Sequence, residues 1–281
     1  FQVTQKDGMR HSAAVAYLRP ALKRDNLTAI PFAMVTRLTF DGTRCTGAIY
    51  IKDGEEFTVT ASKEVIICGG AFNSPQLLML SGIGDKAKLE TLGIEVIKDL
   101  PGVGQNLQDH LLVAVRYYST QPVSLASEND KEQHEKFASE RKGMLTSNRS
   151  EAGAFVKLNP DSHAPELQFH YNVSLGHADD PTAHGFSFYP GVVSVKSVGY
   201  LELQSADPND PPLIDPNYLA DEADIDVLVA GIKLSREIVK APAYDAYRGE
   251  EYQPGADVTS DDDIKDYIRD TVRNIFHPVG T

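Results

Sequence analysis

The sequence predicts a Rossmann-like α/β domain combined with an α+β domain built on an antiparallel sheet. A short apolar run followed by two glycines and a helical pattern, residues 65–80, is what a nucleotide-binding α/β fold needs, and plain packing is the other interpretation of this pattern. Strand-like runs with long connections, residues 111–204, predict the sheet of the second domain. With 281 residues, 41% of them hydrophobic, the chain is long enough for about two domains.

The first part of the chain predicts one helix and a small antiparallel meander. Residues 10–22 are rich in alanine and carry apolar residues at helical spacing, so we expect a helix that breaks at Pro20. Asp-Gly pairs then divide the chain into β-rich runs, as they do in hairpins. The expected strands are residues 28–40, 45–52 and 56–61.

An apolar run at residues 64–68 predicts a parallel strand that is covered on both faces. We expect the thiol of Cys68, at the end of this run, to be buried. Cys45, the other cysteine of the chain, also falls in a predicted strand. The sequence leaves open whether the two cysteines form a disulfide.

Two short helices are expected next. Asn73 or Ser74 would cap the first helix, and Pro75 would lie in its first turn. The second helix would span residues 85–92, with Asp85 as its cap. A loop rich in glycine and proline follows, and we place the crossing to the second domain just after it.

The second part of the chain predicts strands first and helices later. The polar residues 127–141 are expected to form a surface helix or a mobile loop, and the proline-rich residues 205–219 are expected not to form regular sheet. An amphipathic pattern predicts a helix over 221–239, and Ser260 with three following aspartates predicts another helix start. The expected strands are residues 112–118, 167–172, 186–195 and 200–204.

Composition excludes several classes of partner. The net charge is −13 and the isoelectric point is near 5.0, which argues against binding to nucleic acid or to an anionic membrane surface. No apolar run approaches the roughly 20 residues that a membrane span needs.

Glycosylation sequons at Asn26, Asn148 and Asn172 predict a secreted, extracellular glycoprotein.

The final residues, NIFHPVGT at 274–281, contain a candidate catalytic base. A histidine titrates near neutral pH and can accept the proton of a hydroxyl group, which suits His277 to this role. Pro278 restricts His277 to an extended backbone, and Gly280 permits a tight turn. A His-Pro pair in a loop is more commonly a surface turn, so these residues alone leave both interpretations open.

Two segments resemble one family of enzymes. Residues 70–84, GAFNSPQLLMLSGIG, resemble the second signature of the glucose–methanol–choline (GMC) family of FAD-dependent alcohol oxidoreductases. Residues 274–281 resemble the segment that carries the catalytic histidine of that family. The flanking blocks GMRHSAAVAYLRP, KEVIICGGA, GVGQNLQDH and SVGYLELQSADPNDPPLIDPNYL resemble family blocks as well. The similarity covers nearly the whole chain.

The resemblance implies a fold, a cofactor and a reaction. The fold would be an FAD-binding α/β domain with a substrate domain, and Val35 and Gly70 would contact the FAD. His277 would take the proton of a small-molecule alcohol, typically a primary one, while a hydride passes to flavin N5 and an aldehyde forms. The electrons would then pass to O2 or to a quinone-type acceptor.

The residues before the histidine suggest a branch of the family. Ile275 and Phe276 resemble the aryl-alcohol oxidase branch, in which aromatic residues beside the histidine shape a narrow apolar substrate pocket. Packing in the core is the other interpretation of these two side chains.

The resemblance also divides the chain and indicates what it lacks. Residues 1–110 would belong to the FAD-binding domain, 111–250 to the substrate-binding domain, and 251–281 to a return to the FAD domain. No G-x-G-x-x-G finger is present, so the chain is expected to be part of a longer parent whose remaining segments are its partners. Two alternatives stay open, namely a lyase of the hydroxynitrile type that keeps FAD without net redox chemistry, and an inactive structural fragment.

No metal site is expected. A group of acids and histidines has ligand-type side chains, but it falls in a predicted loop without helical spacing. Its members are His177, Asp179, Asp180 and His184. The G-x-S-x-G and H-E-x-x-H motifs of hydrolases are absent from the sequence.

Overall fold

The computed structural model describes residues 2–176, 180 and 182–281. The chain divides into two compact units, and each unit contains segments that are far apart in the sequence. Unit 1 consists of Phe1–Leu27, His110–Lys196 and Asp221–Ile275, and unit 2 consists of Thr28–Asp109, Ser197–Ala220 and Phe276–Thr281. The division of the family domains at residues 110 and 250 stays a prediction.

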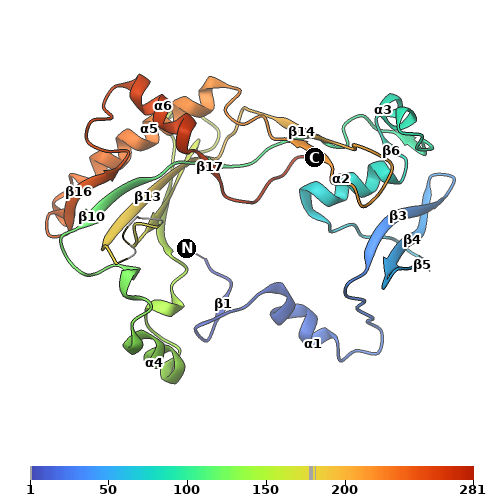
Figure 1. Ribbon diagram of the computed structural model, residues 1–281, viewed down its shortest axis with the longest axis horizontal. Helices are drawn as coiled ribbons and strands as arrows, with labels where there is room; N and C mark the ends of the chain where they lie inside the picture. The colour runs from blue at the N-terminus through green and yellow to red at the C-terminus, as the bar shows by residue number, and fades with distance from the viewer. Residues whose placement is uncertain (1, 177–179, 181) are drawn as a thin grey trace. The chain divides into compact units, whose positions relative to one another are not determined.

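Unit 1 is built on an antiparallel sheet whose strands follow the order β11-β12-β13-β10-β16, of which β10, β13 and β16 are labelled in Figure 1. It contains three of the four expected strands, whereas the one expected at 200–204 forms β14 (Gly199–Glu202) in unit 2, which corrects the prediction. A short strand, β9, pairs with β13 and with β17. The strands are β9 (Leu111–Leu112), β10 (Val115–Ser119), β11 (Ser150–Val156), β12 (Leu167–Asn172), β13 (Gly185–Val192), β16 (Arg248–Gln253) and β17 (Arg273–Asn274). The central strands are buried because sheet neighbours lie on both sides and helices cover one face.

Helices α5 (Glu222–Val239) and α6 (Asp261–Thr271) confirm the predicted amphipathic helix and the predicted helix start. The Asp221 carboxylate accepts a hydrogen bond from the backbone of Ala223, and Ser260 and Asp263 form a reciprocal capping box. Helix α5 packs on the sheet at Gly231, where an added Cβ would lie 2.5 Å from the ring of Pro190. Helix α4 (Lys131–Glu140) confirms the surface-helix alternative for the polar stretch.

The helix predicted near the N-terminus forms, but it does not break at Pro20. A π-helical turn, η1 (Ala14–Leu18), runs directly into α1 (Arg19–Ala21), and Pro20 lies inside α1. The backbone N–H of Arg19 donates to the carbonyl of Ala14, five residues earlier. This wider hydrogen-bond pattern accommodates Pro20, which has no backbone N–H to donate. The remaining short elements of unit 1 are β1 (Gln5–Lys6), β2 (Met9–Arg10), η2 (Leu125–Ser127), η3 (Met144–Thr146) and η4 (Pro242–Tyr244).

Unit 2 contains the predicted meander as β3 (Met34–Asp41), β4 (Arg44–Lys52) and β5 (Glu55–Thr60). Gly42 and Gly54 adopt positive φ angles of 58° and 83° in the two turns, as the Asp-Gly pairs predicted. The first strand begins at Met34, six residues later than the run at 28–40 suggested.

The strand predicted at residues 64–68 is wrong. These residues form no strand, and the side chain of Ile66 is 74% exposed. A strand needs a neighbour to satisfy its backbone groups, and no strand of the described residues pairs with this run. Cys68 is therefore exposed rather than buried, and both cysteines carry free thiols.

Helix α2 (Gly70–Leu80) begins earlier than predicted. Gly70, with a φ of 77°, lets the chain turn into the helix directly after Gly69, so Asn73 and Ser74 lie within it instead of capping it. Pro75 consequently lies inside α2 and not at its first position. Helix α3 (Lys86–Thr91) is capped by Asp85 as predicted.

The proline-rich stretch at 205–219 does contain a strand, which corrects the prediction. Strand β15 (Leu213–Asp215) pairs with β14 (Gly199–Glu202), which in turn pairs with β8 (Gln105–Leu107). The strand is short and lies at a sheet edge, so Pro212 and Pro216 fall outside it. Strands β6 (Ile83–Gly84) and β7 (Lys98–Asp99) form a parallel pair.

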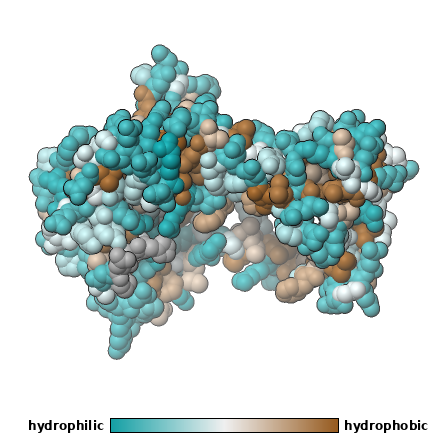
Figure 2. All heavy atoms as spheres, turned by 45° about the horizontal axis from the view of Figure 1, so that its top comes forward, coloured by the Kyte–Doolittle hydropathy of each residue, from teal (hydrophilic) through white to brown (hydrophobic). Residues whose placement is uncertain are grey.

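Hydrophilic residues cover most of the face shown in Figure 2, with hydrophobic residues gathered in separate patches. In unit 2, Met79, Leu89 and Leu201 form a buried cluster that holds α2, α3 and β14 together. Among the described residues, every helix is too short or too polar to cross a membrane.

Candidate active site

The segment after the candidate base is fastened to the loop that leads out of β8. The N–H of Gln108 donates to the carbonyl of Val279 at 2.9 Å, and the N–H of Val279 donates to the carbonyl of Gln108 at 2.8 Å. Gly280 has a φ of 102°, and a Cβ there would lie 2.0 Å from the carbonyl oxygen of Asn106. Only glycine fits this close approach, which explains the glycine that the sequence places there.

This fastening brings His277 next to a buried carboxylate. Nδ1 of His277 lies 3.9 Å from Oδ1 of Asp109, whose side chain is 2% exposed. The hydroxyl of Tyr218 donates a hydrogen bond to the other oxygen of Asp109 at 3.1 Å. The His277 side chain itself is 51% exposed, so its ring is accessible to a substrate hydroxyl.

The two segments that resemble the family signatures meet in unit 2. The hydroxyl of Thr281 donates to the carbonyl of Ala71, near the start of α2, at 2.5 Å. A motif near the middle of the first half of the chain and a motif at its end therefore form one local structure. The sequence predicts both motifs, but a local pattern does not show that they lie side by side.

A cavity of about 710 Å³ lies beside α2, within unit 2. Its walls come from β3, residues 65–69, α2 and the loop at 208–212, and Val35 is among the lining residues. Gly70 is not among them, although its neighbour Gly69 is, and nothing lies within 4 Å of a Cβ built on Gly70. The cavity thus combines apolar walls with the start of a helix.

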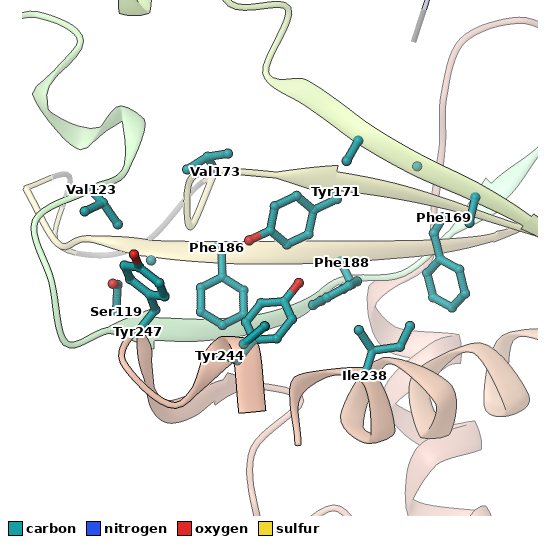
Figure 3. A pocket seen from close by; sticks show the side chains of 15 residues that line it. Ser119, Val123, Phe169, Tyr171, Val173, Phe186, Phe188, Ile238, Tyr244 and Tyr247 are labelled. Carbon is teal, nitrogen blue, oxygen red and sulfur yellow. The ribbon is translucent and has the colours of Figure 1, made fainter. Parts of the chain in front are cut away.

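Unit 1 has a second cavity, of about 610 Å³, between the sheet and the end of α5. In Figure 3 the rings of Phe186, Phe188, Tyr171 and Tyr244 point toward one another across this space. Burial raises the pKa of Tyr171 well above its usual value, with Tyr244 contributing, so the Tyr171 hydroxyl is neutral at physiological pH. No charged residue lines the cavity among the described residues. Sequence reasoning missed it, although aromatic residues at every second position of β12 and β13 were a signal.

Neither residue of the expected substrate pocket lines either cavity. Phe276 is 86% exposed and has a φ of 60°, so it does not pack in a core. Ile275 is half-buried in unit 1. Their role beside a substrate stays a prediction.

No group of three or more potential metal ligands is found in the described part of the chain. His177 and Asp179, two members of the group considered from the sequence, lie outside the described residues. His184 is engaged elsewhere, because its Nδ1 lies 2.9 Å from the hydroxyl of Ser124.

Comparison with known proteins points to one family. Two family models described as GMC oxidoreductase match residues 1–112 and residues 195–281. The chain belongs to the GMC oxidoreductase family. Its fold is that of a GMC oxidoreductase with an FAD-binding and a substrate domain, and its cofactor is FAD.

Curated relatives match the chain along almost its full length. Human mitochondrial choline dehydrogenase is 42% identical over 286 residues, covering 99% of this chain and 48% of the relative. An alcohol dehydrogenase [acceptor] of Pseudomonas putida is 41% identical over 298 residues, covering 100% of this chain and 53% of the relative. The chain therefore spans about half the length of the curated relatives it matches.

Solved structures share the fold. Pyridoxine 4-oxidase from Mesorbium loti has a TM-score of 0.83 and 27% identity, covering 99% of this chain and 52% of that one. Formate oxidase from Aspergillus oryzae has a TM-score of 0.88 and 24% identity, covering 99% and 54%. A fungal aryl-alcohol oxidase has a TM-score of 0.82 and 24% identity, covering 97% and 55%. The last two likenesses show the fold alone, so membership of the aryl-alcohol oxidase branch stays a prediction.

The residues of unit 2 fit part of an FAD molecule. The cavity beside Val35 offers apolar walls for a flat ring, and open space surrounds the Cα of Gly70. Helix α2 begins there without a side-chain cap and without an acidic residue in its first turn, which leaves its backbone N–H groups to an anion such as a phosphate. Val35 and the start of α2 would hold the nucleotide portion.

Proposed function

We propose that the full-length protein containing this chain oxidises a primary alcohol to an aldehyde, with His277 as the base. The observation that carries this proposal is the half-exposed imidazole of His277 beside the buried carboxylate of Asp109. The names of the relatives support the class of substrate, because they are a choline dehydrogenase and an alcohol dehydrogenase.

The residues of the chain bind, orient and move one proton. His277 accepts the proton of the substrate hydroxyl, and Asp109 orients the ring and stabilises the imidazolium that forms. Tyr218 in turn holds the Asp109 carboxylate through its hydroxyl. Bound FAD would supply the two-electron acceptor for the hydride of the carbinol carbon, with O2 or a quinone-type compound as the final electron acceptor.

The substrate that we favour is a small alcohol of the choline type. Phe276 places an exposed aromatic ring directly before the base. Such a ring attracts a quaternary ammonium group through its π face, and it can equally stack on an aryl alcohol. Identity of 41–42% to the two dehydrogenases favours choline as the first compound to test and an aryl alcohol as the second.

Replacing the base tests the proposal directly. In the full-length protein with FAD bound, His277→Gln should slow alcohol-dependent flavin reduction by about 10²- to 10⁴-fold, the usual contribution of a general base. Anaerobic stopped-flow absorbance measures this rate, and the flavin content should be unchanged. His134→Gln, on the exposed helix α4, is the matched control and should reduce flavin at the wild-type rate. Equal rates for His277→Gln and wild type would refute the role of His277.

We further propose that the protein is exported and glycosylated, as its sequons predict. Asn26 and Asn148 are exposed, whereas Asn172 is half-buried in β12 and accepts a hydrogen bond from Ser150 at 2.7 Å. Glycans would therefore be carried at Asn26 and Asn148. Treatment of the protein from its native source with an endoglycosidase should lower its mass, and an unchanged mass would contradict glycosylation.

A further inference from the structure

Pro75 leaves one carbonyl of α2 without its regular partner. In an α-helix the N–H of each residue donates to the carbonyl four residues earlier, so position 75 would serve Ala71. Proline has no N–H, and Pro75 lies buried inside α2. The carbonyl of Ala71 is therefore open to a donor from outside the helix.

Thr281 supplies that donor. Its hydroxyl donates to the carbonyl of Ala71 at 2.5 Å, in a partly buried setting where an unmet carbonyl would be costly. Pro75, which lacks the N–H, belongs to the signature segment at 70–84. Thr281, whose hydroxyl takes the place of that N–H, belongs to the segment at 274–281.

The chain between Thr281 and the base has little freedom. Pro278 fixes its own φ, Val279 is paired with Gln108, and Gly280 is pressed against the carbonyl of Asn106. An anchor at Thr281 therefore restrains the backbone of residues 277–281 from the far end, while Asp109 lies 3.9 Å from Nδ1 of the imidazole.

We propose that Thr281, bound to the carbonyl that Pro75 leaves free, is a positioning residue that holds His277 in place for proton transfer. The inference rests on the proposed function of His277. Thr281 acts through the backbone and touches neither the substrate nor the reacting atoms. Its hydroxyl, rather than its size, is the group that matters.

Two substitutions at Thr281 in the full-length holoenzyme separate the hydroxyl from the shape. Thr281→Val keeps the shape and should lower kcat by about three- to ten-fold, the range that one hydrogen bond corresponds to, with KM changed by less than two-fold. Thr281→Ser keeps the hydroxyl and should retain the wild-type kcat. Thr91→Val is the matched control, because the Thr91 hydroxyl also donates to a helix carbonyl, that of Lys88 at 2.6 Å, but in α3.

Hydrogen exchange tests the anchor independently of catalysis. Exchange of the segment 276–281 should be about three- to ten-fold faster in Thr281→Val and unchanged in Thr281→Ser and Thr91→Val. If His277→Gln reduces flavin normally, the proposed function fails, and hydrogen exchange still decides whether Thr281 anchors the segment.

The Pro75→Ala variant tests why the carbonyl is free. Its new N–H competes for Ala71, so exchange of 276–281 should rise at least two-fold, and Thr281→Val should add less than two-fold in this background. This variant also carries the test if Thr281→Val does not fold. Unchanged exchange in Pro75→Ala, equal losses in Thr281→Ser and Thr281→Val, or faster exchange with an unchanged kcat would each overturn the inference.

Discussion

The candidate active site of unit 2 lies on irregular backbone, whereas the aromatic cavity of unit 1 is lined by side chains of regular strands. In unit 2, His277 lies on an irregular segment held by backbone hydrogen bonds and by residues with positive φ, such as Asn106 and Gly280. In unit 1, buried rings project from the regular strands β12 and β13 (Figure 3). The first arrangement fixes one chemical group at one point, and the second provides a rigid apolar wall.

The two regions should therefore respond differently to mutation. A wall of packed rings loses stability when one ring is removed, because a cavity is left behind. A loop held by single contacts loses geometry when one contact is removed, with little effect on global unfolding. Three changes, in order of decreasing effect, test this distinction.

The largest effect is expected from Phe188→Ala in the wall of unit 1. Phe188 is 4% exposed and packs against Phe169, Tyr171 and Tyr244. Its truncation should lower the free energy of unfolding by about 3–5 kcal/mol, measured by denaturant titration. Phe32→Ala, at a side chain that is 94% exposed, is the control and should cost less than about 0.5 kcal/mol. Similar losses in both variants would show that the rings do not form a core.

A smaller and local effect is expected from Gly280→Ala in unit 2. The new Cβ would meet the Asn106 carbonyl at 2.0 Å, and the φ of 102° is strained for alanine. The free energy of opening of residues 276–281 should fall by about 2–3 kcal/mol in native-state hydrogen exchange. Gly42→Ala, at a positive φ with open space around it in the turn between β3 and β4, is the control and should leave this segment unchanged. Wild-type protection of the segment in Gly280→Ala would contradict the close fit.

The smallest effect concerns the alkaline limit of unit 1. Burial raises the folded-state pKa of Tyr171 above its unfolded value near 10, so this side chain stabilises the fold fully below about pH 10 and progressively less as the pH rises above it. Tyr171→Phe should therefore weaken the decline of unfolding free energy at alkaline pH. Tyr17→Phe, at a side chain that is 77% exposed, is the control. An identical alkaline decline in Tyr171→Phe and wild type would contradict this assignment.

Local signals predicted the helices better than the strands. Helices α3 and α6 were found because Asp85 and Ser260 cap them through residues that are close in sequence. Strand β12 matches its predicted bounds, and Leu167 and Phe169 are its buried positions. Strands β11 and β15 were missed, and the strand at 64–68 was wrongly predicted, because pairing depends on neighbours that a local pattern does not reveal.

The candidate active site likewise contains residues that the sequence predicts and residues that it does not. His277 and the start of α2 could be named from two segments that resemble family signatures. The partners of His277 could not, because Asp109 and Tyr218 approach it from distant parts of the chain. The role of Pro75 was misjudged for a related reason, since its position in α2 depends on where Gly70 lets the helix begin.

We propose that this chain is part of an FAD-dependent alcohol oxidoreductase that acts through His277. The most direct measurement is the visible absorption spectrum of the purified full-length protein before and after anaerobic addition of choline, and then of an aryl alcohol. We predict flavin bands that bleach on addition of one of these alcohols, with a rate that depends on His277. Flavin bands that remain unchanged with both alcohols, or a folded protein without flavin, would contradict the claim.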